Sequence, residues 1–390
     1  MNIASPKKNN TAGRKKILCV MSDVGGAHRS AAEAMGEALQ REYPPNSFTY
    51  EIVDLYQVAG GFCNFSIKSY PFFVNHYTWI YNRFFDFADH RPTWDFFYKV
   101  FIYPFMIGRV VPFIKKKKPD VILSTYALCN RLVLDALEEL NLADRVLKVM
   151  LVLDLFDVHR SWAEPRADLT IVATTGAKRK IMACGVPPGK VKQWGFPVKP
   201  RFQDDIQPQR VREKLGLHRD CFTTLIMGGG EGVHYTYHIV KGLMENNLKT
   251  QLIVIAGRNA WLLNKLQGLQ QRTDARMVVF GYTDKVHELM SVSDVVITKP
   301  GPTTLMEAMT KELPVIITGN PPRQELHNID YVREKGIGHT LKKGEAFVPL
   351  LQKLIDSPDE IERLKANIRR EKIPACAGKV ARLIMTHPKA

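Results

Sequence analysis

Short apolar runs alternate with amphipathic or polar stretches along most of the chain, which predicts parallel strands covered by helices. The first buried strand is expected at Ile17–Met21, followed by a glycine-containing turn and a helix over Ser30–Glu42. The first half of the chain is therefore predicted to be one α/β domain. Its further strands are expected at Glu51–Leu55, Val121–Ser124, Val146–Leu153 and Leu169–Ala173.

The second half repeats this pattern independently and predicts a second α/β domain. A polar, proline-containing stretch separates the halves, so we place the hinge at residues 197–208 and the domains at 1–203 and 204–370. The last helical stretch is interrupted at Pro374, and residues 371–390 are expected to pack back on the first domain. Strands of the second domain are expected at Thr223–Met227, Leu252–Ala256, Met277–Phe280, Val295–Ile297 and Val315–Thr318.

Composition narrows the class of protein. With 390 residues, 45% apolar and 24% charged, the chain is expected to be folded rather than disordered. The six cysteines are scattered without CxxC or Cys/His ligand spacing, so neither a metal site nor a disulfide framework is predicted, and a reducing cytoplasm fits best. The basic first 17 residues lack an apolar core and no run of 18 apolar residues occurs, so neither a signal peptide nor a spanning helix is expected.

Charge and aromatic residues point to a polyanionic partner. The 55 Lys and Arg residues exceed the 39 Asp and Glu residues, which favours nucleic acid, an anionic membrane or a phosphorylated small molecule. Residues 60–118 are far richer in Phe, Tyr and Trp than the 9% average and end in Lys115–Lys118. This pattern predicts a peripheral, anionic membrane surface. Aromatic core under two long helices is the alternative, and no nucleic-acid-binding motif is present.

The turn after the first strand carries the first candidate chemistry. Gly25 and Gly26 let a ligand approach the backbone, and the helix that follows presents free N–H groups to an anion. His28 lies at this position and is a candidate general base, with a simple helix cap as the alternative. After the fourth strand, Asp154 and Asp157 are candidates to orient His28 or to contact an acceptor hydroxyl, with a solvated loop as the alternative.

Three stretches of the second domain offer groups that suit phosphate and sugar hydroxyls. A glycine-rich turn after its first strand predicts a phosphate cradle but does not match an ATP-hydrolysing P-loop. The stretch from Lys299 offers hydroxyls and amides for phosphate, and Glu307 suits ribose hydroxyls or, alternatively, the helix dipole. Gln324 and Glu325 form an amide–acid pair able to hold sugar hydroxyls. The cradle and phosphate residues are Gly228, Gly229, Gly230, Glu231, Pro300, Gly301, Thr303 and Thr304.

Together these motifs resemble the GT-B glycosyltransferases. They are most similar to the group of monogalactosyldiacylglycerol synthases and processive diacylglycerol glucosyltransferases, and more distantly to the peptidoglycan N-acetylglucosaminyltransferase. The resemblance covers about Lys16–Pro374. It is carried by GGAHRSAAEA (25–34), DLFDVHRSW (154–162), GFPVKPRF (195–202), MGGGEG (227–232), AGRN (256–259), KPGPTTLMEA (299–308) and RQELHN (323–328).

The resemblance implies two Rossmann-like domains facing a cleft, with a lipid acceptor on the first and a nucleotide sugar on the second. It implies inverting transfer of galactose or glucose from UDP-galactose or UDP-glucose to diacylglycerol, without a metal or other cofactor. The resemblance also implies that His28 is the general base or donor-site histidine of the family and that Glu307 faces the ribose. Donor binding by Gly257, Arg258 and Tyr282 is implied in the same way.

Four positions depart from the family pattern, among them Leu326 and His327, where relatives usually have smaller or charged residues. Ala27 stands where a third glycine is usual, and Thr303 stands where close relatives tend to have glycine. The identity of the sugar is left open. The alternatives to a diacylglycerol hexosyltransferase are a transferase with another lipid acceptor such as a polyprenyl-linked one, a UDP-sugar epimerase, and a non-catalytic sensor of a nucleotide sugar at the membrane.

Overall fold

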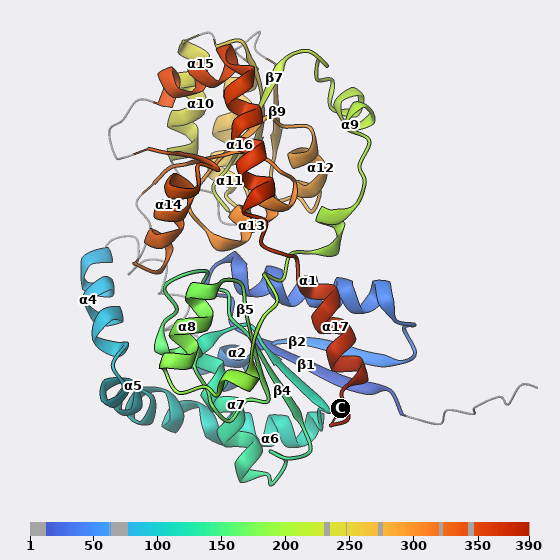
Figure 1. The fold of residues 1–390 in the computed structure, drawn as a ribbon, viewed down its shortest axis with the longest axis vertical. Helices are drawn as coiled ribbons and strands as arrows, with labels where there is room; N and C mark the ends of the chain where they lie inside the picture. The colour runs from blue at the N-terminus through green and yellow to red at the C-terminus, as the bar shows by residue number, and fades with distance from the viewer. Residues whose placement is uncertain are drawn as a thin grey trace, which may run out of the picture.

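The chain folds into two α/β domains stacked one above the other, as the computed structural model in Figure 1 shows. Each domain contains a six-stranded sheet in which all strands run parallel. The predicted fold class, two doubly wound α/β domains, is confirmed. The structure describes residues 13–61, 63, 77–229, 235–246, 248–271, 276–319, 323–341 and 347–389.

The first sheet has the strand order β2-β1-β3-β4-β5-β6. Every strand expected in this domain is present within a few residues, whereas β6 was missed. This strand is only three residues long and contains two polar residues, so it leaves no apolar run in the sequence. The strands are β1 (Lys15–Met21), β2 (Phe48–Asp54), β3 (Val121–Ser124), β4 (Leu147–Leu151), β5 (Leu169–Val172) and β6 (Val191–Gln193).

The second sheet has the order β12-β11-β10-β7-β8-β9. Its five expected strands are present, and the three-residue edge strand β12 was missed for the same reason as β6. The strands are β7 (Phe222–Met227), β8 (Thr250–Ile255), β9 (Met277–Phe280), β10 (Val295–Thr298), β11 (Val315–Ile317) and β12 (Gly338–Thr340).

Helices cover the sheets and link the strands. In the first domain they are α1 (Gly26–Glu42), α2 (Leu55–Ala59), α4 (Thr78–Ala88), α5 (Arg91–Phe97), the π-helical η1 (Tyr98–Ile102), α6 (Tyr103–Lys117), α7 (Ala127–Glu139), η2 (Arg160–Trp162), α8 (Thr175–Ala183), η3 (Pro188–Lys190) and η4 (Pro200–Gln203). In the second they are α9 (Pro208–Leu215), α10 (Tyr235–Glu245), α11 (Ala260–Gln270), α12 (Val286–Ser291), α13 (Pro302–Thr310), α14 (Arg323–Lys335), α15 (Phe347–Asp356) and α16 (Pro358–Arg370), and the chain ends in α17 (Ala377–Thr386).

Strand β1 shows why this sheet needs helices on both faces. Ile17 and Cys19 belong to the apolar cluster that includes residues of α1 and α17, whereas Leu18 and Val20 belong to the cluster that includes residues of α6 and α7. Because successive strand residues point to opposite faces, a strand that is apolar at every position requires a cover on each side. A continuous apolar run in the sequence therefore specifies a central parallel strand.

Each sheet has one topological switch point, which is a pair of neighbouring strands from which the chain continues toward opposite edges of the sheet. In the first sheet this point lies between β1 and β3, and in the second it lies between β7 and β10. Ligands of open α/β sheets bind beyond the carboxyl ends of the strands at such points. The loops that follow these four strands are therefore the places where a binding site is expected.

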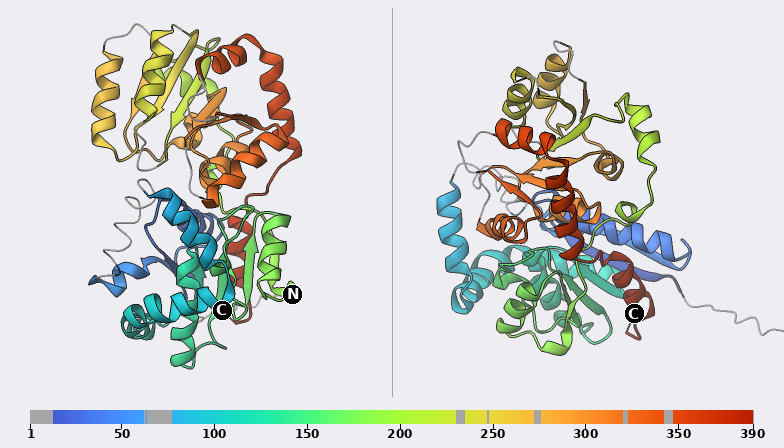
Figure 2. Two further views of the ribbon diagram at one scale, coloured as in Figure 1. Left: turned by 90° about the vertical axis from the view of Figure 1, so that its left-hand side faces the viewer. Right: turned by 45° about the horizontal axis from the view of Figure 1, so that its top comes forward.

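The chain crosses between the domains twice, and the two crossings touch. The Phe196 amide donates to the carbonyl of Pro374 (2.9 Å), and the Cys376 amide donates to the carbonyl of Phe196 (2.9 Å). Beyond the second crossing, α17 packs on α1, and Figure 2 shows it on the lower domain in both views. Lys15 Nζ donates to the carbonyls of Ile384 (3.2 Å) and Met385 (2.8 Å), which fixes the carboxyl end of α17.

Helices α5, η1 and α6 form one continuous helix, Arg91–Lys117, that is long and apolar enough by length and composition to cross a membrane. The sequence predicted no such helix, because it contains no run of 18 apolar residues. One stripe of it, including Tyr98, Met106 and Val110, is buried against the first domain. Only 28% of the apolar 18-residue stretch within this helix is buried. Its outer side exposes Phe96, Phe101 and Phe105. The expected aromatic surface therefore has buried rings on one side and exposed rings on the other.

Candidate functional site

His28 sits at the switch point of the first sheet. Helix α1 begins at Gly26, four residues earlier than expected, so His28 lies in the first helical turn. Its Nδ1 is 2.6 Å from the carbonyl oxygen of Thr125, the residue that follows β3. Because a carbonyl only accepts hydrogen bonds, Nδ1 carries the proton, and Nε2 of the neutral ring keeps its lone pair.

Burial lowers the pKa of His28 to about 4, partly offset by the bond to Thr125 and by the charge of Asp23. His28 is therefore neutral near pH 7, in the form that can accept a proton. The ring of Tyr126 packs edge-on against it, with centroids 4.7 Å apart. The hypothesis that an aspartate orients His28 is wrong for Nδ1, because a backbone carbonyl on the neighbouring strand occupies that position.

The two glycines before His28 leave space at the start of α1. Gly25 has a φ of 70° and is the N-cap of the helix, with no side-chain cap bond. A Cβ atom at Gly25 or Gly26 would meet no atom of the described structure within 4 Å. Close packing therefore does not explain why position 26 is a glycine. The open space beside the first helical amides fits the predicted approach of an anion.

Asp154 lies after β4, and its carboxylate accepts a hydrogen bond from Trp162 Nε1 (2.7 Å). The Trp162 ring is also 6.3 Å from the ring of His28, so the indole lies beside both candidate catalytic residues. Burial raises the pKa of Asp154 to about 7, with smaller contributions from Asp157 and Glu325, while the Trp162 bond lowers it. Asp154 thus titrates near neutral pH, as a group that transfers protons does.

The structure separates the other two polar residues of this loop. Asp157 faces the second domain, where its Oδ2 is 3.4 Å from His327 Nε2. His159 is buried, and its ring lies 4.5 Å from the Phe85 ring and 5.8 Å from the Trp94 ring. Asp157 therefore contributes to the domain boundary, and His159 to the packing of the aromatic segment.

Replacing Trp162 by phenylalanine is expected to raise the pKa of Asp154 by roughly one pH unit, since one hydrogen bond to the carboxylate is lost. Because the pKa of Asp154 is higher in the folded protein than in the unfolded chain, binding of its proton stabilises the fold. This stabilisation is complete below the ordinary pKa of 3.8 and is lost as the pH rises through about 7. In the variant the loss moves to higher pH. A carboxyl ¹³C NMR titration, with Asp154→Asn to assign the signal, measures the change. An unchanged or lower pKa would contradict the role given to the indole N–H.

Lys299 occupies the switch point of the second sheet. It follows β10, and a Cβ at Gly229 or Gly301 would lie 3.5 Å or 3.4 Å from Lys299 Cε. The side chain thus lies beside both predicted phosphate loops. Lys299 Nζ pairs with Glu325 Oε1 (3.0 Å), which ties α14 to these loops. A flexible ammonium group between two glycine turns is suited to a diphosphate.

Helix α13 brings three further predicted residues to this point. Gly301 is its N-cap without a side-chain cap bond, and Thr303 Oγ1 is buried without a hydrogen-bond partner in the described residues. Thr304 is buried beside it. Burial raises the pKa of Glu307 to about 8, and the charge of Lys199 opposes this. Glu307 is thus largely protonated at neutral pH and can both donate to and accept from a pair of hydroxyls.

The remaining predicted donor residues fall into two groups. Gln324 and Glu325 begin α14, which Asn328 Nδ2 fastens to the phosphate loop by donating to the carbonyl of Pro300 (2.8 Å). Gly257, with a φ of 65°, and Arg258 follow β8, and the Arg258 guanidinium lies 4.3 Å from the centre of the Tyr282 ring, which follows β9. Gly230 and Glu231 lie outside the described residues.

Sequence reasoning missed Thr125, Tyr126 and Trp162 as parts of the site. Trp162 belongs to a motif that the sequence analysis did single out, so its indole N–H was a usable signal. Thr125 carried none, because its contribution is a backbone carbonyl placed by the β1–β3 pairing. The described residues contain no group of three or more His, Cys, Asp or Glu side chains placed to hold a metal ion.

Known proteins match this chain in both halves. The family described as monogalactosyldiacylglycerol (MGDG) synthase matches residues 28–198, and the glycosyltransferase family 28 C-terminal domain matches residues 223–379. Monogalactosyldiacylglycerol synthase of Spinacia oleracea is 29% identical over 84% of this chain, which spans 64% of that relative's length.

Solved structures agree in fold at low sequence identity. MurG of Acinetobacter baumannii covers 95% of this chain and 99% of its own, with a TM-score of 0.59 and 13% identity. A Listeria monocytogenes protein assigned as a UDP-N-acetylglucosamine 2-epimerase covers 96% and 95%, with a TM-score of 0.60 and 16% identity. These two likenesses establish the fold alone. Residues 28–198 therefore carry an MGDG synthase domain and residues 223–379 a glycosyltransferase family 28 C-terminal domain, and together these two domains make the chain a glycosyltransferase.

Proposed function

We propose that this glycosyltransferase moves a hexose, galactose or glucose, from a UDP-sugar to diacylglycerol with inversion at the anomeric carbon. The observation that carries the proposal is the contact between the loop after β4 of the first domain and α14 of the second, where Asp157 Oδ2 lies 3.4 Å from His327 Nε2 and the ring of Phe156 lies 4.5 Å from that of Tyr331. His28 and Asp154 come from the first domain, and Lys299, Thr303 and Glu307 come from the second. The match to the MGDG synthase family and the spinach relative support a galactolipid as the product.

In the proposed reaction the acceptor hydroxyl attacks the anomeric carbon from the side opposite UDP. The new C–O bond forms as the bond to the β-phosphate oxygen breaks, and the hydroxyl proton passes to Nε2 of His28. UDP leaves with the bonding electron pair, and its charge is met by the start of α13 and by Lys299. In this scheme protein dipoles and one ammonium group stabilise the leaving group, and no resident metal is required.

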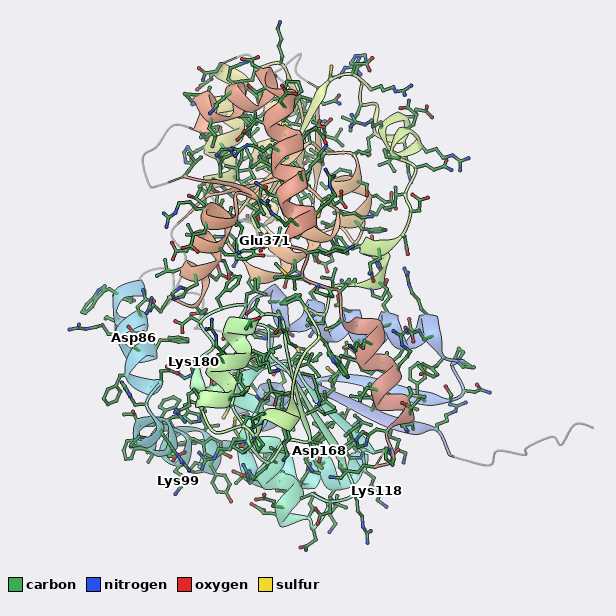
Figure 3. The ribbon with its side chains drawn as sticks, in the orientation of Figure 1. Asp86, Lys99, Lys118, Asp168, Lys180 and Glu371 are labelled. Carbon is green, nitrogen blue, oxygen red and sulfur yellow. The ribbon has the colours of Figure 1, made fainter. Side chains whose placement is uncertain are left out.

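We further propose that the acceptor is reached at the surface of an anionic membrane. The residues that support this lie on α4 and on the helix Arg91–Lys117, which expose large apolar side chains and also the cations Arg83 and Lys99. Figure 3 labels Lys99 and Lys118 along the lower edge of the same domain. Aromatic rings settle at headgroup depth and lysines attract anionic lipid. The exposed side chains are Tyr77, Trp79, Ile80, Phe87, Phe96, Val100, Phe101 and Phe105.

The proposal is tested by incubating the purified protein with anionic vesicles that contain diacylglycerol, in the presence of EDTA. UDP-galactose, UDP-glucose and UDP-N-acetylglucosamine are each supplied with a labelled sugar, and label is counted in the organic phase. Label from galactose or glucose, undiminished by EDTA, is the expected result. Label that appears only with added divalent metal would contradict the metal-independent scheme.

Other outcomes separate the alternatives. Absence of label from every donor, with UDP binding intact, would contradict diacylglycerol as acceptor and point to another lipid or to a sensor. A protein that converts one UDP-sugar to another and stays in the soluble fraction during vesicle flotation would be an epimerase, since epimerisation needs no membrane surface.

A further inference from the structure

One stripe of α14 contacts the first domain. Arg323, His327 and Tyr331 recur every fourth residue and therefore share one face of the helix. His327 pairs with Asp157, and the Tyr331 ring lies 4.5 Å from the ring of Phe156. Both partners belong to the loop that carries the catalytic candidate Asp154. The helix that begins with the donor-side residues is thus in direct contact with the acceptor domain.

Arg323 extends this stripe to α4. Its backbone N–H donates to Asn82 Oδ1 (3.0 Å), and its Nε donates to Asp86 Oδ1 (3.2 Å). The first amides of a helix have no partner within the helix itself. Here a side chain of the other domain satisfies one of them, so α4 acts as a cap for α14. Figure 3 shows Asp86 on α4, the light-blue helix that reaches toward the upper domain.

Other residues of α14 hold the loops of the second domain that are predicted to bind the donor. Glu325 pairs with Lys299, and Asn328 donates to the carbonyl of Pro300. A displacement of α14 would therefore move the groups predicted to bind the diphosphate and the sugar. Along this helix Arg323 is two positions from Glu325 and five positions from Asn328.

Helix α4 presents two different faces. Successive helix residues are turned by about 100°, which places Trp79, Ile80 and Phe87 within about 100° of one another, with Trp79 bordering the side that carries Asn82 and Asp86. The first three side chains are 70%, 47% and 63% exposed. The other side makes the contacts with Arg323. One short helix thus carries an exposed apolar face and a capping face.

We propose that α4 couples membrane binding to donor binding. The occupant of its apolar face is the surface of an anionic bilayer, which the aromatic rings and the exposed Arg83 favour. A bilayer that fixes α4 also fixes Asn82 and Asp86, and these hold α14 through Arg323. Arg323 is accordingly a positioning residue for the donor site. The inference rests on the proposed function, since it assumes a UDP-sugar donor and a membrane.

The coupling is measured as a ratio of donor dissociation constants. Binding of UDP-galactose and UDP-glucose is titrated by calorimetry with and without vesicles of phosphatidylglycerol and phosphatidylcholine that lack diacylglycerol, so that no transfer occurs. The wild type is expected to bind its donor about five- to tenfold more tightly on vesicles, a typical size for coupling between two sites. Linkage requires the donor to raise vesicle affinity by the same factor.

Asp86→Ala and Arg323→Ala are each expected to bring this ratio close to one. Donor binding without vesicles and flotation with vesicles should stay within about twofold of the wild type, because an exposed ion pair contributes little by itself. The exchanged pair, Asp86→Arg with Arg323→Asp, should restore part of the ratio. Arg369→Ala is the matched control, since Arg369 forms a similarly exposed pair with Glu312 inside the second domain (2.9 Å).

Each outcome bears on one claim. A wild-type ratio of one with positive flotation overturns the coupling, as do single variants that keep the wild-type ratio. Loss of the ratio in Arg369→Ala as well would show a general effect of charge removal and would also overturn it. Absence of flotation or of donor binding in the wild type would instead contradict the proposed function. A thermal unfolding curve for every variant separates these results from loss of the fold.

Discussion

Replacement of His28 by alanine is expected to lower turnover by a factor of about one hundred or more while leaving UDP binding largely intact. The reason is geometric. Nδ1 of His28 is committed to the carbonyl of Thr125, so Nε2 is the atom left to accept the proton of the acceptor hydroxyl. The measurement is single-turnover transfer of labelled hexose with saturating donor, paired with calorimetric titration of UDP.

The control for this variant is His218→Ala, which removes an exposed histidine at the opposite, amino-terminal end of β7. It should leave turnover unchanged. Added imidazole is expected to restore part of the activity of His28→Ala, because a small base can occupy the vacated space. Turnover near that of the wild type would remove His28 from the role of base, and Asp154, whose pKa is about 7, would become the stronger candidate.

Gly195→Ala is expected to destabilise the protein by about 2–5 kcal/mol, the sum of a strained backbone and an overpacked contact. Gly195 has a φ of 110°, and a methyl group there would overlap the carbonyl oxygen of Pro374. That carbonyl accepts the Phe196 amide, so the substitution acts where the two crossings between the domains touch. Urea unfolding followed by circular dichroism measures the loss.

Gly185→Ala is the matched control for Gly195→Ala. Gly185 has a φ of 100°, and a Cβ there would meet no atom of the described structure within 4 Å. It therefore carries the backbone strain without the contact, and its expected cost is only about 1 kcal/mol. Equal destabilisation by the two substitutions would show that the contact with Pro374 contributes nothing.

Much of the architecture followed from the chain's own pattern of residues. Apolar runs such as Ile17–Met21 can be satisfied only between two helical layers, so they predicted the parallel sheets. Glycine turns directly after strands marked the positions of Gly25 and Gly229, because backbone approach to a ligand needs residues without side chains. The three-residue strands β6 and β12 were not predicted, since a strand at the edge of a sheet can pair without an apolar run in its sequence.

The order of strands in the sheets, which no local pattern reveals, decided how the site is assembled. His28 is oriented by Thr125 because β3 pairs with β1, and these residues are separated by nearly a hundred positions along the chain. The pKa of Asp154 likewise depends on burial and on charges from both domains. The stripe of Arg323, His327 and Tyr331 is visible as a four-residue repeat, but its partners belong to the other domain. The sequence determined which residues are available for chemistry, and long-range packing determined their neighbours, protonation and contacts.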